Sequence, residues 1–121
     1  MSGFVLVLIM SEACGHCRTF KTNQLDTLRK KLSKEFKNVS LEVINLPSFS
    51  SPLPSNCPQS LKNIIAWYPM LVLMTDDQWR SGSLTNYSVF NGILGQGGKP
   101  RYVSKYDLNV DHILDWIENG N

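Results

Sequence analysis

The chain has 121 residues, 42% of them hydrophobic, and a formal net charge of +2. This is the size and composition of one globular domain with a single core, and a charge so near neutral does not favour nucleic acid as a partner. Three cysteines are too few for a disulfide-stapled secreted scaffold, so a working thiol pair in a reducing compartment is favoured.

The first part of the chain predicts a strand, a helix and a second strand. Residues 3–10 are apolar throughout and rich in Val, Leu and Ile, as in a strand covered on both faces, so this strand is expected at the centre of its sheet. From residue 14 to about residue 37, hydrophobic residues recur close to helical spacing among basic ones, which predicts one amphipathic helix. Residues 39–46 are predicted to form the second strand.

The second part predicts two loops, two strands and two helices. Residues 47–58 are rich in Pro and Ser and should be an irregular loop, after which Pro58 suits the first turn of a short helix. Strands are expected at 70–74 and 87–91, forming an antiparallel hairpin. The glycine-rich stretch 92–106 should be irregular, and a final helix should begin near Asn109, a good N-cap.

The order βαβαββα begins with a right-handed parallel unit and ends with a hairpin closed by a helix. We therefore expect a single domain over residues 1–121 in the α/β class, with a central mixed four-stranded sheet and helices on both faces. Two irregular loops, at about 47–58 and 92–106, should lie within this domain.

Residues 4–10, followed by Ser11, Glu12 and Ala13, are also compatible with a secretory signal. No positive charge precedes this run, and cleavage would remove the first strand. The run is too short to span a bilayer, and the last residues form no endoplasmic-reticulum retention signal. We therefore expect a soluble, uncleaved, cytoplasmic protein, or one in the virion or host cytoplasm if a virus encodes it.

The motif Cys14-Gly15-His16-Cys17 lies where the first strand ends and the long helix starts. Free N–H groups of the first turn and the positive end of the helix dipole stabilise a thiolate there, so Cys14 is the expected nucleophile. Cys17, one turn on, can close a disulfide with it or resolve a mixed disulfide. A partly cationic His16 would further stabilise the thiolate and make the disulfide more oxidising, unless it is simply an exposed histidine of little influence.

With this motif after the first strand, the chain resembles the thioredoxin superfamily in its compact, glutaredoxin-like form, and the tetrapeptide resembles that of protein disulfide isomerases. The resemblance implies a three-layer α/β/α domain. Tyr68-Pro69, before the third strand, matches the family's cis-proline, which implies that Tyr68 and Pro69 hold an extended substrate chain. A trans proline beginning an edge strand is the alternative. Gly92 matches the glycine that keeps the substrate groove open, with an ordinary turn glycine as the alternative.

Two residues depart from the family pattern. Leu8 occupies the position of a buried carboxylate that helps take the proton from the second thiol in thioredoxins and disulfide isomerases, and Ala13 replaces the tryptophan before the first cysteine. We expect slower substrate release and a less covered site.

The resemblance implies a monomeric thiol–disulfide oxidoreductase in which Cys14 and Cys17 form the redox-active disulfide. Its partners would be protein thiols and disulfides and a recycling reductase or oxidase, with glutathione as a further candidate. No cofactor, metal or membrane is expected, since only Cys57, His16 and His112 remain as zinc ligands beyond the pair. Cys57 is read as a free thiol, or as a regulatory or intermolecular one. The alternatives are a binding or structural module with little redox turnover and a glutathione-dependent glutaredoxin.

Overall fold

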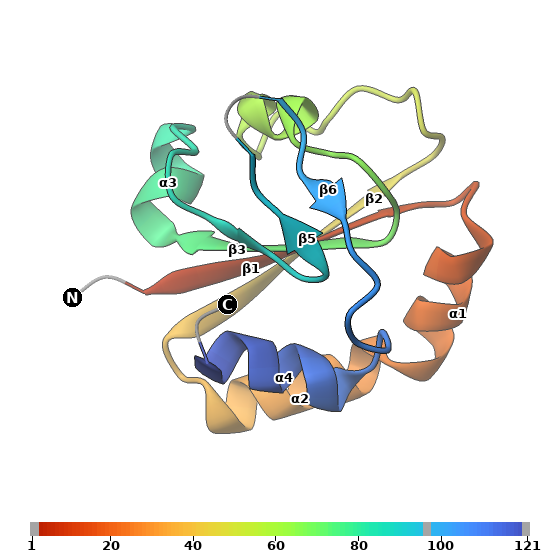
Figure 1. Cartoon of the computed structure of the whole chain (residues 1–121), viewed down its shortest axis with the longest axis vertical. Helices are drawn as coiled ribbons and strands as arrows, with labels where there is room; N and C mark the ends of the chain where they lie inside the picture. Colours follow the sequence, from red (N-terminus) through yellow and green to blue (C-terminus); the bar gives the residue numbers. More distant parts are fainter. Residues whose placement is uncertain (1–2, 96–97, 120–121) are drawn as a thin grey trace.

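The computed structural model describes residues 3–95 and 98–119, and its centre is a mixed four-stranded sheet in the order β2-β1-β3-β4 (Figure 1). The strands are β1 (Phe4–Ser11), β2 (Val39–Leu46), β3 (Met70–Thr75) and β4 (Ser88–Val89). β1 runs parallel to β2 and antiparallel to β3, and β4 is antiparallel to β3. The expected α/β class with a central mixed four-stranded sheet is confirmed, and the arrangement is compatible with a thioredoxin-like fold.

β1 is the central strand, as predicted, and it separates two hydrophobic clusters. Successive side chains of a strand point to opposite faces of the sheet. One face receives Leu6, Leu8 and Met10, and the other receives Val5, Val7 and Ile9. Because all six are buried, β1 needs cover on both sides, and this explains its unbroken apolar sequence.

Three helices cover one face: α1 (Gly15–Asn23), α2 (Leu25–Glu35) and α4 (Val110–Asn119) (Figure 1). The prediction of one continuous helix over residues 14–37 is wrong, because the chain leaves helical geometry at Gln24 (φ −124°, ψ −29°). The Gln24 side-chain oxygen accepts a hydrogen bond from the Val110 N–H at 3.1 Å, so the break supplies a cap for the first turn of α4. α4 begins as predicted, with the Asn109 side chain accepting from the His112 N–H at 2.9 Å.

The loop 47–58, the 3₁₀ helix η1 (Gln59–Asn63) and α3 (Asp76–Ser81) cover the other face. The short helix expected after Pro58 is present in 3₁₀ form. The predicted order βαβαββα has no helix between its third and fourth strands, so the helix α3 corrects it. Its first turn is capped by the Thr75 hydroxyl, which accepts from the Gln78 N–H at 3.2 Å.

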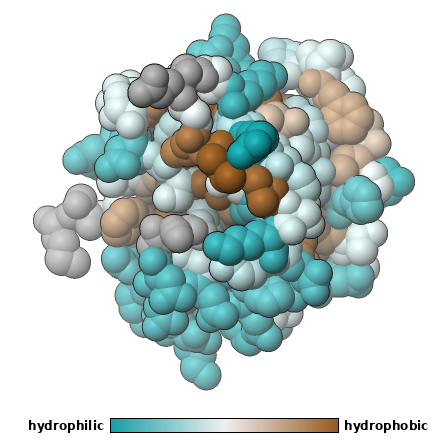
Figure 2. Space-filling model, viewed as in Figure 1, coloured by the Kyte–Doolittle hydropathy of each residue, from teal (hydrophilic) through white to brown (hydrophobic). Residues whose placement is uncertain are grey.

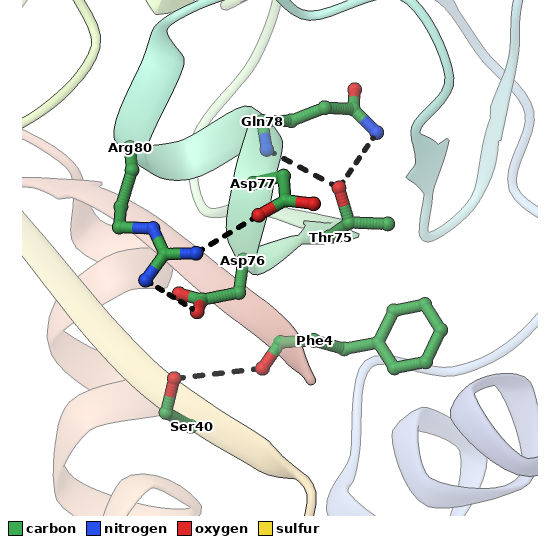
Figure 3. A network of polar contacts seen from close by, with 7 residues as sticks. All are labelled: Phe4, Ser40, Thr75, Asp76, Asp77, Gln78 and Arg80. Carbon is green, nitrogen blue, oxygen red and sulfur yellow. Dashed lines mark hydrogen bonds and ion pairs between the residues drawn. The ribbon is translucent and has the colours of Figure 1, made fainter. Parts of the chain in front are cut away.

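Figure 3 shows the polar contacts around this short helix. Asp76 and Asp77 both reach Arg80, at 3.3 and 2.9 Å, on the exposed side of α3. Exposed pairs of this kind contribute about 0–1 kcal/mol each, so the Thr75 cap and the left-handed Gly82 (φ 79°) at the end do more to define the helix.

The prediction of an irregular stretch over 92–106 is wrong in part. β5 (Gly92–Ile93) pairs antiparallel with β6 (Arg101–Tyr102) in a small second sheet, and residues 96–97 lie outside the described residues. The fourth predicted strand, 87–91, is regular only over β4, because Asn91 adopts a left-handed conformation (φ 56°). The Asn91 side chain donates to the Tyr106 C=O at 2.8 Å and accepts from the Tyr106 N–H at 3.0 Å, which fixes the returning segment.

In the part of the chain that the structure describes, no helix has the length and apolar character needed to cross a membrane.

Candidate active site

Cys14 is the N-cap residue of α1, directly after the turn that follows β1. Its backbone is extended (φ −101°, ψ 118°), and its N–H donates to the Ser11 C=O at 3.1 Å. The Cys17 N–H donates to Cys14 Sγ at 3.1 Å, so the sulfur takes the place of the usual capping oxygen. A free N–H of the first turn therefore points at the sulfur, as the motif predicts. Both cysteines are free thiols.

Cys17 lies deeper than Cys14, with exposed fractions of 2% and 7%. The pKa of Cys17 is raised to about 12, mainly because burial disfavours the thiolate and further because of its hydrogen bond with Cys14. The Ser11 backbone and the Arg18 charge offset part of this effect. Cys17 is therefore held as a thiol beneath Cys14, an arrangement that suits a second, resolving role.

The Tyr68–Pro69 peptide bond is cis and lies beside Cys14, although the two segments are far apart in the sequence. Cys14 Sγ donates to the Tyr68 C=O at 3.6 Å. Tyr68 contacts both hydrophobic clusters, and burial raises the pKa of its hydroxyl, with a smaller contribution from Cys17. The fold thus brings Tyr68, Pro69, Cys14 and Cys17 together.

A groove of about 340 Å³ extends from this site, and His16 is on its wall. Its lining comprises His16, Trp67, Tyr68, Pro69, Leu71, Phe90, Asn91, Tyr102 and Leu108. Trp67, Asn91 and Tyr102 were missed by the sequence analysis. A signal for Trp67 was available, since an aromatic residue next to the expected cis-proline must lie near the site. Tyr102 had none, because its approach depends on the β5–β6 hairpin.

Gly92 lies on β5 and does not line the groove itself. A Cβ at this position would come within 2.8 Å of Val89 Cγ1 and 3.0 Å of the Trp67 ring. The absence of a side chain therefore lets β5 pack closely against Trp67, which does line the groove.

The position expected for a family carboxylate is filled by hydrocarbon. Leu8 is completely buried in the same cluster as Cys14 and Cys17. Polar groups approach Cys17 instead through a second cavity of about 510 Å³. It is lined by Met10, Ser11, Glu12, Cys17, Arg18, Lys21, Thr22, Asp26 and Asn45. The sequence analysis did not find this cavity, because α2 contributes to it only after the bend at Gln24.

The rim of this cavity is held by two hydrogen bonds to Glu12. The Arg18 guanidinium donates to its C=O at 3.0 Å, and the Asn45 amide donates to its carboxylate at 2.7 Å. The Arg18 side chain is thereby fixed beside the motif.

Cys57 and His112 lie away from the two cysteines of the motif. Cys57 is buried in the cluster on the opposite face of the sheet, and its thiol donates to the Pro54 C=O at 3.2 Å. Burial raises its pKa. His112 Nδ1 lies 3.0 Å from the Asp107 C=O. Within residues 3–95 and 98–119, no three His, Cys, Asp or Glu side chains come together as metal ligands would.

A scan against protein-family models finds no match for this chain, and a search of curated protein sequences finds none. The resemblance to the thioredoxin superfamily is therefore carried by the motif, the cis-proline beside it and the order of the sheet.

Proposed function

We propose that the protein is a thiol–disulfide oxidoreductase of the thioredoxin superfamily, exchanging disulfides with protein substrates through Cys14 and Cys17. The observation that carries the proposal is the position of Cys14 Sγ, 3.1 Å from the Cys17 N–H and 3.6 Å from the carbonyl oxygen of Tyr68 at the cis-proline. One sulfur is thus in contact with a helix N-terminus, a second thiol and a backbone that can hold a peptide.

In the proposed reaction, the Cys14 thiolate attacks one sulfur of a substrate disulfide. A mixed disulfide forms, and the other substrate sulfur leaves as a thiolate that takes up a proton. Cys17 then loses its proton and attacks Cys14 Sγ, which closes the Cys14–Cys17 disulfide and releases the second substrate thiol. The substrate gains two electrons and two protons, which the dithiol has lost.

Each turnover consumes the dithiol, so a partner must restore it. A reductase that returns two electrons would make the protein a reductant of other proteins, and an oxidase would make it an oxidant. We place it in the cytoplasm as a monomer, with His16 on the groove wall tuning the potential.

The test uses Cys14→Ser, Cys17→Ser and, as a matched control, Cys57→Ser. Insulin-disulfide reduction should be abolished by Cys14→Ser, whereas Cys17→Ser should accumulate a mixed disulfide that mass spectrometry detects after non-reducing separation. Cys57→Ser, a buried thiol on the other face, should retain the wild-type rate. Wild-type rates in both motif variants would reject the mechanism.

A second candidate is a thioredoxin-fold binding module with little turnover. Leu8 and the high pKa of Cys17 favour it, because no buried carboxylate lies among the hydrocarbon beneath the thiols to take the proton. A redox titration with rate measurement decides between the two. A module should show either no reversible couple in the physiological range or exchange no faster than that of a free dithiol.

A glutathione-dependent glutaredoxin is the third candidate. Reduction of the Cys14–Cys17 disulfide by glutathione alone, at a useful rate, would favour it.

A further inference from the structure

We infer that the groove beside Cys14 selects an extended protein segment with an aromatic side chain next to its reactive cysteine, and that Tyr102 and Trp67 form the wall that recognises this side chain. The inference rests on the proposed function and names the substrate class of the same site.

Two exposed aromatic rings flank the cis-proline dipeptide. Tyr102 is 53% exposed and packs edge-to-face on Trp67, with centroids 5.1 Å apart. Phe49 is 54% exposed and lies 5.0 Å from the Tyr68 ring. Tyr102 and Phe49 come from the two stretches that the sequence analysis separated from the common core, 92–106 and 47–58. Figure 2 shows strongly hydrophobic side chains at the centre of the face where Figure 1 draws β5 and β6; Tyr and Trp lie near the pale middle of its colour scale.

Local hydrogen bonds hold the backbone segments that carry both exposed rings. The segment after Tyr102 is tied to Asn91 by the Val103 N–H, which donates to the Asn91 C=O at 2.8 Å. Phe49 sits in a turn closed by Ser48 and Ser51, whose N–H groups donate to the Ser51 hydroxyl at 3.1 Å and the Ser48 C=O at 3.2 Å. The segments that carry the rings are therefore preorganised, and each ring packs on a neighbouring aromatic side chain, which lowers the entropy that a ligand loses in ordering them.

The chemistry of the groove favours an uncharged partner group. Among the described residues, His16 is the one titratable cation in its lining, and no Asp, Glu, Lys or Arg lines it, so the ammonium group of glutathione would meet no fixed negative charge and its carboxylates no permanent positive charge there. A volume of about 340 Å³ accommodates a large apolar side chain, and Trp67 and Tyr102 offer ring faces and edges for it.

The backbone beside the groove suits an extended chain. Among the described residues, the Tyr68 N–H donates to no other group, and the Tyr68 C=O accepts only from Cys14 Sγ. A substrate strand can use this donor and acceptor, which places the side chain next to its cysteine toward the groove.

The experiment measures kcat/KM for disulfide-linked peptides that differ only in having Phe or Ser next to the cysteine, on its N-terminal or its C-terminal side. Wild type should prefer a Phe peptide about fivefold to tenfold, mainly through KM. Tyr102→Ser should reduce this preference to less than about twofold, whereas Tyr102→Phe, which retains the ring, should keep it. Phe4→Ser is the matched control, since Phe4 is 41% exposed at the opposite end of β1 and should leave the preference intact.

Equal kcat/KM values for all peptides in wild type, an unchanged preference in Tyr102→Ser, or its loss in Phe4→Ser would overturn the inference. Failure of the proposed function gives a different result. Wild type would then exchange with no disulfide, including the small aromatic disulfide of Ellman's reagent, faster than a free dithiol does.

Discussion

The two sides of the Cys14–Cys17 pair differ in charge. On the side of Tyr68, the groove has no Asp, Glu, Lys or Arg in its lining, and aromatic rings flank it. On the side of Cys17, the larger cavity has four charged side chains in its lining. They are Glu12, Arg18, Lys21 and Asp26. We therefore expect two separate tasks: a substrate chain would meet the side whose lining has His16 as its one titratable cation, whereas the Cys17 proton would leave through the side with the four charged groups.

The largest effect is expected on the free energy of unfolding, from the hydrophobic cluster that holds both cysteines. Leu8→Ala removes a completely buried side chain and should reduce the free energy of unfolding by about 2–5 kcal/mol. Urea denaturation of the reduced protein measures this. Leu94→Ala, at an exposed position directly after β5, should cost less than about 1 kcal/mol. If Leu8→Ala loses little free energy of unfolding, the Leu8 side chain beside the two cysteines is not part of the packed core.

The pH dependence of the resolving step, in which Cys17 attacks the mixed disulfide, tests the cavity beside Cys17. Burial is the largest cause of the raised pKa of about 12, and because burial does not depend on a free Cys14 thiol, we expect the pKa of Cys17 to stay raised in the mixed disulfide. Because only the thiolate attacks, closure of the Cys14–Cys17 disulfide from a preformed mixed disulfide should accelerate about tenfold per pH unit between pH 7 and 9. Stopped-flow release of a chromophoric substrate thiol measures the rate. A flat profile would show that Cys17 is already ionised at neutral pH.

Gly92→Ala probes the groove side. The added Cβ would meet Val89 at 2.8 Å and Trp67 at 3.0 Å, so either β5 or the Trp67 ring must move. We expect a loss of about 1–3 kcal/mol in the free energy of unfolding and a raised KM for peptide substrates. Gly95→Ala is the matched control, because nothing lies within 4 Å of its Cβ position. If the two variants have the same stability and KM, the close packing of β5 on Trp67 is unimportant for the groove.

The sequence predicts the core of the fold well because its signals are local. β1, β2 and β3 are apolar runs with clear ends, and Asn109, a favourable N-cap residue, indicates where α4 begins. The bend at Gln24 was missed although it carried a signal, since the step from Phe20 to Leu25 departs from the i+3 and i+4 spacing of one continuous helix. α3 carried a usable signal, Thr75 followed three residues later by Gln78, which matches a capping box. β5 and β6 are two residues each, too short for an alternating pattern.

The candidate site, like the fold, has one part that the local sequence predicts and another that depends on long-range contacts. Cys14, His16 and Cys17 form one local motif, and the peptide bond before Pro69 is cis, as the family resemblance implied, and not trans as in the alternative. The roles of these residues stay predictions. Tyr102 reaches the groove through the pairing of β5 with β6, and the Asn91 side chain holds the segment that follows; no sequence period encodes either contact.

The smallest effect is expected from the charge of Arg18. The guanidinium lowers the pKa of Cys17 and donates to the Glu12 C=O at 3.0 Å, so it acts on the cavity side alone. Arg18→Gln should raise the pKa of Cys17 further and slow disulfide closure about twofold to threefold at pH 7 and low salt. Screening should make the difference smaller at high ionic strength.

Arg29→Gln, an exposed position on α2 outside this cavity, is the charge-matched control and should leave closure unchanged. The two sides of the site are independent if Arg18→Gln keeps the wild-type preference between Phe and Ser peptides while closure slows. A loss of peptide preference together with slower closure would show instead that charge on the Cys17 side also shapes the groove, and the separation of tasks would fail.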